Sequence, residues 1–580
     1  MVQCGVTILT AEKAGGPVPA KTSSLLIQDS TYTQYPAFAS SRSALPDLYT
    51  HRNDSMSHAI VADAVNWAAS LSDTAQALLD DHNVPWRALI TSIMVASLPA
   101  LLLYRQYIHP LAGIPGPVLA RFTGQWRNWY YINGQWHDVI LDLHTTYGRV
   151  VRIAPNELSI VDEKTARLLY GHGTSSEKTD WYATWDIPNA APGLFATRDR
   201  KEHAFLRRRV SAAFSMTSIL KFETYIQGSF DLLFDKMRKY SGQMIDMSEW
   251  TNAVAYDIVG ELAYGEQLGH LQSETDVMGV RQAVLDGFYL MANLGHYWGQ
   301  GRLLNTKVMA KLTSALGVRN PFLEFRQWSV DKVRARRDNP SQAERHDMLH
   351  HFLQMKDING NPASDGEVLI EAMNIIGAGA DTTAIGMRAC LYYVCTHPQV
   401  YRQLQKELDD YFQSRPDQRS ISYNEARGLT YLNAVISEAT RLHPSIIYQL
   451  LRAAPEDITV DGHRILRGTP VGISPRAQNR DRAIWGEDAN EFRPERWLEN
   501  EERARYFESV NMTFGGNGPR MCIGRNIALV ELFKYIAQLL YNFDVELEDP
   551  ARPWNVQTVW FAYQHDMYVR VTERNRGLST

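Results

Sequence analysis

One segment near the middle of the 580-residue chain limits its fold more than any other. Glu371 to Val394 reads EAMNIIGAGADTTAIGMRACLYYV and is almost entirely apolar. A helix containing it can begin at a capping box formed by Ser364 and Glu367, and must end before His397-Pro398. About 30 residues rising 1.5 Å each would cross an entire domain. The chain is therefore expected to fold around this helix.

The centre of this predicted helix has an unusual composition. Gly377 and Gly379 each cost a helix interior about 1 kcal/mol relative to alanine, and Asp381-Thr382-Thr383 places polar groups in an apolar segment. One interpretation is a close helix crossing with a hydrogen-bonded polar cluster. The other is that the glycines leave room for a ligand, while the acid and the alcohol distort the helix and relay protons.

The remainder of the chain from His109 onward contains no flexible linker and no repeat, so we expect one domain over residues 109–580. Helical patterns dominate it. The strand-like stretches are few and short: Val150 to Ile153, Glu157 to Val161, Ile458 to Val460 and Met567 to Val571. The predicted fold class is mainly α with small β-sheets.

The N-terminal region differs from this domain. Residues 1–83 form a variable tail: residues 1 to about 55 lack sustained periodicity and predict disorder, whereas helical spacing from Ser57 to Leu79 predicts a possible amphipathic helix. Residues 84–108 contain the uncharged run Ala88 to Tyr104, which predicts a transmembrane anchor rather than a buried helix. Arginines follow this run, so the downstream domain should be cytosolic and the tail lumenal, with a glycosylation site at Asn53. HPLAGIPGP, residues 109–117, would form a stiff connector.

Charge and cysteine usage exclude some classes of protein. The net charge is -5, which argues against nucleic-acid binding because neutralising phosphates requires clustered lysine and arginine. Only four cysteines are present, and their spacing predicts neither a disulfide framework nor a zinc site.

One of these cysteines lies in a glycine-rich loop, FGGNGPRMCIG, residues 514–524. A helical pattern begins directly after Cys522, so the thiol is placed at a helix N-terminus, where the dipole and free N–H groups stabilise a thiolate. Three interpretations remain open from the residues alone: a nucleophile, a structural thiol or a metal ligand.

Two further motifs flank this loop in the sequence. Glu438 and Arg441 lie on one helix face three residues apart, a pattern that is common on exposed helices. The segment FRPERW, residues 492–497, supplies Arg496, which could join them in a buried cluster of one carboxylate and two arginines.

Taken together and in this order, these features resemble the cytochrome P450 family of haem-thiolate monooxygenases. The resemblance extends from His109 to the C-terminus and rests on AGADTT at 378–383, the Glu438–Arg441 motif, PERW at 494–497 and the cysteine loop. The anchor and the connector are similar to those of microsomal members, and the style of the connector resembles filamentous-fungal enzymes.

This resemblance implies roles for individual residues. Cys522 would be the axial ligand of iron in haem b, and Asp381 and Thr382 would be the catalytic acid–alcohol pair that delivers protons during oxygen activation. Glu438, Arg441 and Arg496 would form a structural triad supporting the cysteine loop. The residues expected to contact the haem are Cys522, Arg520, His203, Arg207, Arg452, Gly516 and Phe514.

The cysteine loop departs from the family pattern at one point. The family has a phenylalanine seven residues before the cysteine, whereas here Gly515 occupies that place and Phe514 lies eight residues before. One extra residue, most simply Asn517, lengthens the loop.

The resemblance also implies partners and a substrate class. Electrons would come from NADPH through a separate membrane-bound NADPH–cytochrome P450 reductase in the endoplasmic reticulum. The expected pocket residues Asn374, Ala378, Ile446 and Ile447 favour a lipophilic small molecule, in this case a fungal secondary metabolite. The alternatives are a detoxifying hydroxylase or O-demethylase of aromatic compounds, an isomerase or dehydratase that needs no dioxygen, and a non-catalytic haem-binding protein.

Overall fold

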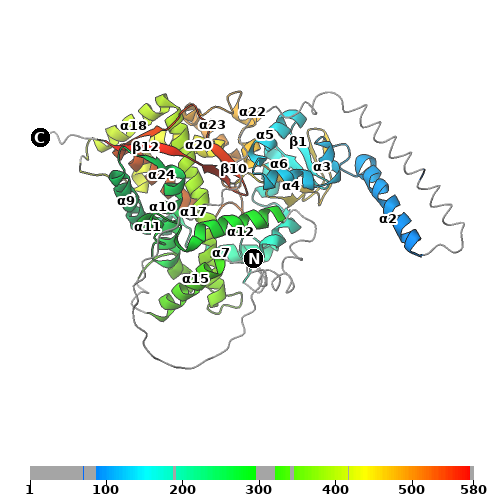
Figure 1. The fold of residues 1–580 in the computed structure, drawn as a ribbon, viewed down its shortest axis with the longest axis horizontal. Helices are drawn as coiled ribbons and strands as arrows, with labels where there is room; N and C mark the ends of the chain where they lie inside the picture. Colours follow the sequence, from blue (N-terminus) through cyan, green and yellow to red (C-terminus); the bar gives the residue numbers. More distant parts are fainter. Residues whose placement is uncertain are drawn as a thin grey trace, which may run out of the picture. The chain divides into compact units, whose positions relative to one another are not determined.

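The computed structural model describes Ser70 and residues 86–186, 191–294, 321–339, 345–415 and 417–574. Its elements are shown in Figure 1. The chain divides into two units, one ending at Ile108 and the other beginning at His109. Asn53 and, apart from Ser70, the predicted amphipathic helix lie outside the described residues.

The first unit contains helix α2 (Trp86–Leu103), which coincides with the predicted apolar run and includes Pro99. A π-helical turn, η1 (Tyr104–Ile108), follows it. Ile93, Leu98 and Leu101 are exposed on α2. By length and composition, α17 (Asp365–Thr396) passes the test for a helix that could cross a membrane, but it is mostly buried in the core.

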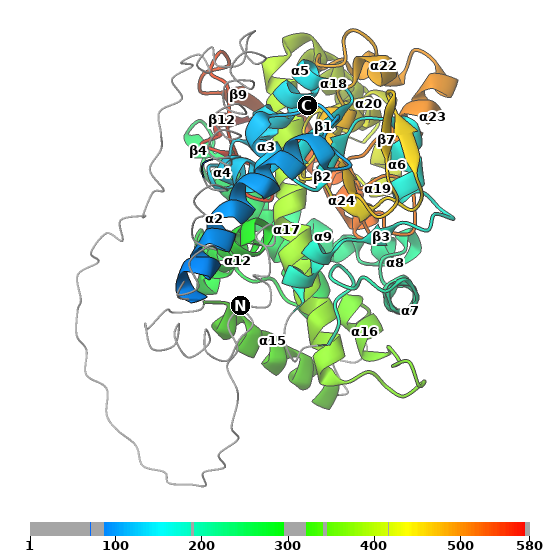
Figure 2. The same ribbon diagram turned by 90° about the vertical axis from the view of Figure 1, so that its right-hand side faces the viewer.

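Helix α17 is the centre of the second unit, as the sequence predicts (Figure 2). It has 32 residues, and Ser364 and Glu367 form both hydrogen bonds of the capping box. The helix is continuous through Asp381 and Thr382, with no break at either residue. A Cβ on Gly379 would lie 3.1 Å from Val259, and one on Gly377 would lie 3.4 Å from Phe288. The glycines therefore permit close packing of neighbouring helices.

Other helices surround α17, and among the described residues its most extensive helix contact is with α10. Those that precede it are α3 (Val118–Phe122), α4 (Gln125–Ile132), α5 (Trp136–Tyr147), α6 (Glu163–Tyr170), α7 (Arg200–Val210), α8 (Met216–Lys221), α9 (Glu223–Lys239), α10 (Met247–Tyr264), α11 (His270–Ser273), α12 (Val280–Leu294), α15 (Pro321–Asp338) and α16 (Met348–Leu353), with 3-10 turns η2 (Asp180–Trp185) and η3 (Val277–Gly279). Those that follow are α18 (Pro398–Phe412), α19 (Tyr423–Gly428), α20 (Thr430–Leu442), α21 (Pro475–Gln478), α22 (Arg482–Trp485), η5 (Pro494–Trp497), α23 (Glu501–Val510) and α24 (Arg525–Asn542).

The strands form small sheets, which confirms the predicted fold class. The largest has the order β1-β2-β8-β5-β3, and a three-stranded sheet has the order β4-β12-β9. The pairs β10-β11 and β6-β7 complete the set within the described residues. The strands are β1 (Val150–Ala154), β2 (Glu157–Ile160), β3 (Glu177–Lys178), β4 (Met244–Asp246), β5 (Arg452–Ala453), β6 (Ile458–Val460), β7 (His463–Ile465), β8 (Pro470–Ile473), β9 (Phe543–Leu547), β10 (Asn555–Thr558), β11 (Ala562–His565) and β12 (Tyr568–Glu573).

The four predicted strands correspond to β1, β2, β6 and β12, each within two residues at its ends. The predicted connector, residues 109–117, contains no helix. The main core lies between α17 and helices α9, α10, α18, α20 and α24, and a second, aromatic core lies beside η2 and the β10-β11 pair. Two smaller cores lie beside β1, β2 and β8 and beside α22 and α23.

Candidate active site

The cysteine loop connects α23 to α24 and is held by its own backbone. Cys522 N–H donates to the carbonyl of Phe514 at 2.9 Å, and Gly515 N–H donates to Met512 at 2.9 Å. Gly515 and Gly516 have φ of 82° and 78°, a region that favours glycine. The Phe514 ring lies 5.7 Å from the guanidinium of Arg525. The hydrogen bond to Phe514 keeps that residue next to the cysteine despite the longer loop.

Two residues of the loop contact neighbouring helices. Asn517 donates from Nδ2 to the carbonyls of Glu508 at 3.2 Å and Ser509 at 3.1 Å, in the last turn of α23. A Cβ on Gly518 would lie only 1.8 Å from the carbonyl oxygen of Tyr170, at the end of α6. Asn517 therefore caps the C-terminal end of α23, and Gly518 admits no side chain in this conformation.

Cys522 is an exposed residue of the described chain, and neighbouring protein atoms desolvate its thiol group. Helix α24 begins at Arg525, three residues later, as the sequence predicts. Burial raises the pKa of the Cys522 thiol, and N–H groups of Gly524 and Arg525 together with the charge of Arg207 oppose this rise. These donors favour the thiolate, and a metal ion would favour it further.

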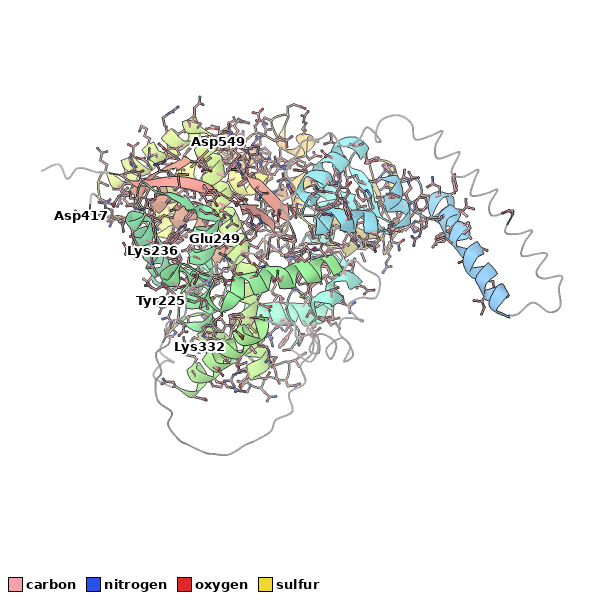
Figure 3. All side chains as sticks on the ribbon, viewed as in Figure 1. Tyr225, Lys236, Glu249, Lys332, Asp417 and Asp549 are labelled. Carbon is pink, nitrogen blue, oxygen red and sulfur yellow. The ribbon has the colours of Figure 1, made fainter. Side chains whose placement is uncertain are left out.

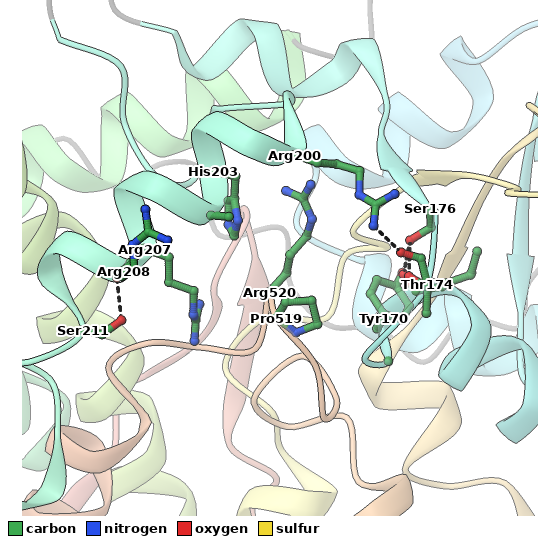
Figure 4. Close-up of a pocket in the computed structure, with 13 residues that line it drawn as sticks. Tyr170, Thr174, Ser176, Arg200, His203, Arg207, Arg208, Ser211, Pro519 and Arg520 are labelled. Atoms are coloured by element: carbon green, nitrogen blue, oxygen red, sulfur yellow. Dashed lines mark hydrogen bonds between the residues drawn. The ribbon is translucent and has the colours of Figure 1, made fainter. Parts of the chain in front are cut away.

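A cluster of basic side chains lies near this loop, as Figure 4 shows. His203 and Arg207 come from α7 and line a pocket together with Arg520 of the cysteine loop. Lys178 of β3 and Arg452 of β5 act electrostatically on both His203 and Arg520. No ion pair of the described residues involves Arg207, Arg452 or Arg520, and Arg520 Nη1 and Arg452 Nε are buried without a hydrogen-bond partner there.

Burial and neighbouring positive charges lower the pKa values in this basic cluster. Burial, and next the charge of Arg520, lowers the pKa of His203 to about 3. Burial, and next the charge of Arg452, lowers the pKa of Arg520 to about 10. Burial and the charges of Arg520 and Arg452 lower the pKa of Lys178 to about 6. A bound dianion would reverse each charge effect, so these residues fit the two propionates of the expected haem.

Lys178 was missed by the sequence reasoning. Its ammonium group donates to the carbonyls of Leu194 at 3.2 Å, Phe195 at 2.6 Å and Thr197 at 3.1 Å. Arg452 Nη1 also donates to the hydroxyl of Tyr182 at 2.5 Å. No local pattern marks these residues, since their partners lie far away in the sequence.

Glu438, Arg441 and Arg496 form one buried cluster. Glu438 accepts from Arg441 Nη2 at 2.7 Å and from Arg496 Nε at 2.8 Å, and all three side chains are almost fully buried. Burial alone would raise the pKa of Glu438, but the hydrogen bonds and charges of Arg441 and Arg496 outweigh it and lower the pKa. Trp497 Nε1 also donates to Glu438 at 2.9 Å.

This cluster is linked to the cysteine loop through Asn479. Arg441 Nη1 donates to the carbonyl of Asn479 at 2.5 Å. The Asn479 side chain donates to Asn511 at 3.1 Å and to Thr513 at 3.2 Å, and it accepts from Met512 N–H at 2.9 Å. Residues 511–513 lead directly into the loop, so its first residues depend on the buried cluster.

The predicted pocket residues of α17 share one face. Asn374, Ala378 and Thr382 are spaced by four residues, and the first two are exposed although most of the helix is buried. The hydroxyl of Thr382 donates to the carbonyl of Ala378 at 2.7 Å. Ser445 donates to the carbonyl of Thr382 at 2.7 Å, which places the loop after α20 beside this face.

The two isoleucines of that loop differ from each other. Ile446 is half-buried and forms a β-bridge with Phe561, whose ring packs against Phe288 at 5.1 Å. Ile447 is fully buried in the aromatic core, with no surface accessible to a ligand. Ile447 therefore does not line the pocket, because alternate residues of an extended segment point to opposite sides.

Asp381 is fully buried, and its carboxylate accepts from two tyrosine hydroxyls. Tyr256 of α10 donates at 2.9 Å and Tyr563 of β11 donates at 3.2 Å. Burial raises the pKa of Asp381 to about 6, and the hydrogen bond from Tyr256 and the charge of Arg388 oppose this rise. A carboxyl group with such a pKa can both bind and release a proton near neutral pH. The tyrosines were not predicted.

Comparisons with known proteins agree with this geometry. The cytochrome P450 family matches residues 115–565. The chain is 33% identical to cytochrome P450 monooxygenase gsfF of Penicillium aethiopicum over 81% of its length and 95% of the relative's. It is 30% identical to cytochrome P450 monooxygenase cicH of Emericella nidulans over 80% and 94%, and 30% identical to a pisatin demethylase of Fusarium vanettenii over 85% and 95%. The chain therefore belongs to the cytochrome P450 family and is a fungal monooxygenase that uses haem iron and electrons from a redox partner.

Proposed function

We propose that this enzyme inserts one oxygen atom from O2 into a lipophilic small molecule of fungal secondary metabolism, with Cys522 as the axial ligand of haem b. The observation that carries the proposal is the exposed Cys522 just before α24, beside the half-buried Arg207 and Arg520, neither of which forms an ion pair among the described residues. When bound, the haem activates dioxygen.

The basic cluster is proposed to hold the haem. Arg520, Arg452, His203 and Arg207 would bind the propionates, because a planar guanidinium matches a carboxylate with two donors. His203 would donate from a ring nitrogen. Phe514 and Gly516 would lie against the porphyrin near the sulfur, which the backbone bond from Cys522 to Phe514 supports.

Asp381 and Thr382 are proposed to supply protons during oxygen activation. The carboxyl group of Asp381 has a pKa near 6 and lies next in sequence to Thr382, which belongs to the accessible face of α17. The hydroxyl group of Thr382 would hold and orient the proton that is delivered. The triad of Glu438, Arg441 and Arg496 would support the cysteine loop through Asn479, so its loss should abolish haem incorporation.

The substrate is proposed to bind on the face formed by Asn374, Ala378 and Ile446. Aromatic rings of η2 and of the β10-β11 turn lie beside this region, and Trp560 packs 5.6 Å from Trp181. An apolar, aromatic lining with few polar groups favours a lipophilic substrate of low charge.

The electron donor and the membrane topology complete the proposal. Electrons would come from NADPH through NADPH–cytochrome P450 reductase at the endoplasmic reticulum. Residues 84–108 would span the membrane once, residues 109–580 would face the cytosol, and the tail, residues 1–83, would be lumenal and glycosylated at Asn53. Loss of glycosidase-sensitive mass in an Asn53→Gln variant would test this orientation, and a tail cleaved by protease in intact microsomes would refute it.

The reduced, carbon-monoxide-bound absorption spectrum tests the central assignment. The Cys522→Ala variant should lose the thiolate signature, whereas Cys395→Ala, at a cysteine of α17 near the β9 carbonyl of Val545, should keep it. A thiolate signature in Cys522→Ala would overturn the assignment. Metabolite profiling of a deletion strain would then identify the substrate, because the precursor accumulates. Absence of NADPH consumption with reductase and that precursor would refute oxygen insertion.

O-demethylation is a second candidate, because one relative is named a pisatin demethylase. Hydroxylation of a methoxy carbon gives a hemiacetal that releases formaldehyde. Formaldehyde formed in proportion to NADPH consumption would favour this outcome over hydroxylation at carbon. An isomerase or dehydratase that needs no dioxygen is disfavoured by the retained Asp381 and Thr382.

A further inference from the structure

The buried side of α17 carries a polar network around the proposed acid, and the tyrosines of this network have no role in the proposed reaction. Asp381 is at its centre, and its two carboxylate oxygens accept from different elements, Oδ2 from Tyr256 of α10 and Oδ1 from Tyr563 of β11. All three residues are buried, with exposed fractions of 0%, 0% and 3%. The carboxylate is thus clamped on the side of α17 that packs into the protein.

Thr382 lies on a different side of the helix. Consecutive residues of an α-helix are about 100° apart, and the Thr382 hydroxyl donates to Ala378 on the accessible face. None of the hydrogen bonds found among the described residues joins Asp381 to Thr382. The carboxyl group must therefore give up at least one tyrosine before it can approach Thr382.

The tyrosine on β11 is itself held in place. Its hydroxyl accepts a hydrogen bond from Asn252 Nδ2, and Asn252 Oδ1 accepts from Arg388 Nη1 at 2.9 Å. The Arg388 guanidinium lies 4.7 Å from the Tyr563 ring and donates from Nε to Gln564 at 2.9 Å. Because the Tyr563 hydroxyl receives one hydrogen bond and donates another, its proton is directed to Asp381.

The charges around Asp381 come from several elements. The hydroxyls of Tyr256 and Tyr563 face it, and the cations Arg388 of α17 and Arg281 of α12 act on it at longer range. Arg281 pairs at 2.6 Å with Glu249, whose side chain is 57% exposed. Glu249 is labelled in Figure 3. Burial, and next the charge of Asp381, raises the pKa of both tyrosines, so both remain protonated donors.

We propose that Tyr256 and Tyr563 are positioning residues that hold the Asp381 carboxylate away from Thr382 and control when it can pass a proton to the accessible face of α17. This inference rests on the proposed role of Asp381 as the acid. Donors to a carboxylate stabilise its charged form, so loss of either hydroxyl should raise the pKa of Asp381 by about one unit.

The test uses Tyr256→Phe, Tyr563→Phe and Asp381→Asn in the holoenzyme. Tyr264→Phe is the matched control, because Tyr264 is a buried tyrosine on the same helix whose hydroxyl donates to Ser329 instead. Infrared difference spectra over a pH titration report the carboxyl band of Asp381, which is assigned by its absence in Asp381→Asn. The expected midpoint is about 6 in the wild type and in Tyr264→Phe, and about one unit higher in each of the other tyrosine variants.

A second readout is the amount of hydrogen peroxide released per NADPH consumed, measured in the presence of reductase. In this side reaction NADPH, a proton and O2 give NADP⁺ and hydrogen peroxide. Peroxide release should rise as Asp381 loses its proton, and this rise should move about one pH unit upward in Tyr256→Phe and Tyr563→Phe. An unchanged carboxyl midpoint in both variants overturns the inference, whereas the acid role survives if Asp381→Asn raises peroxide release. Peroxide release that is unaltered in Asp381→Asn at every pH overturns the acid role and the inference with it.

Discussion

Replacement of Glu438 by glutamine should remove the support of the cysteine loop. The carboxylate accepts five hydrogen bonds: Oε1 from Arg441 Nη2, Arg496 Nε and Arg493 N–H, and Oε2 from Arg441 Nε and Trp497 Nε1. A glutamine offers one oxygen and one NH2 group. In either orientation of the amide, at least two of these donors then face another donor.

The magnitude follows from this count and from the charge. Each buried donor left without an acceptor costs about 1–3 kcal/mol, and breaking a buried ion pair costs about 3–5 kcal/mol. Since Arg441 would remain buried without a carboxylate partner and Arg496 would keep only Asp488, at 3.0 Å, we expect a loss of about 3–5 kcal/mol in the free energy of unfolding. That is a large part of the about 5–15 kcal/mol that stabilises a typical protein.

The measurements are haem content from the reduced carbon-monoxide spectrum and the urea concentration at which that spectrum is lost. Glu438→Gln should hold little or no haem. Glu501→Gln, which removes the exposed pair with Arg505 at 3.3 Å, should behave as the wild type within about 1 kcal/mol. Normal haem content and an unchanged urea midpoint in Glu438→Gln would refute the reasoning.

The pH dependence gives an independent check. Because the pKa of Glu438 is lowered in the folded protein, its carboxylate contributes stability above about pH 4, and this contribution is lost as the pH falls through the lowered value. The difference in unfolding free energy between the wild type and Glu438→Gln should therefore shrink toward low pH. A difference that stays constant from pH 7 to pH 3 would contradict a charge-based role.

Three further predictions concern the cysteine loop and α17. Gly518→Ala should abolish haem binding, since its Cβ would lie 1.8 Å from the Tyr170 carbonyl oxygen. Gly428→Ala, with open space around it, should retain the wild-type spectrum, and equal haem content in the two variants would contradict this prediction. Deletion of Asn517 removes two hydrogen bonds to α23 and should cost about 1–3 kcal/mol in the urea assay, and an unchanged midpoint would exclude its capping role. Thr382→Ala should lower the product formed per NADPH by about tenfold or more, and an unchanged ratio would refute its part in proton delivery.

The central helix and the cysteine loop could be predicted because their signals are local. Capping at Ser364, helical spacing through Val394 and the helix after Cys522 depend on residues a few positions apart. The short strand β8 (Pro470–Ile473) was missed because it lies between β2, which is far away in the sequence, and β5, which has only two residues.

The roles of the glycines in α17 could not be decided in this way. Glycine in a helix is compatible with space for a ligand or with a close neighbour, and the sequence does not say which. The structure places Val259 and Phe288 against Gly379 and Gly377. Similarly, Ile446 and Ile447 are adjacent and alike in chemistry, and only the direction of the extended chain separates an accessible side chain from a buried one.

The sequence by itself determined the family, the cysteine at the helix start and the order of the motifs, because each motif consists of residues that are close together in the chain. The tertiary structure decided what surrounds them. The clamp on Asp381 joins α10, α17 and β11, and Lys178 meets Arg452 and Arg520 from three distant segments. Such clusters depend on burial and on charges brought together by folding. The residues next to a hydroxyl or ammonium group in the sequence do not indicate which distant group it will contact.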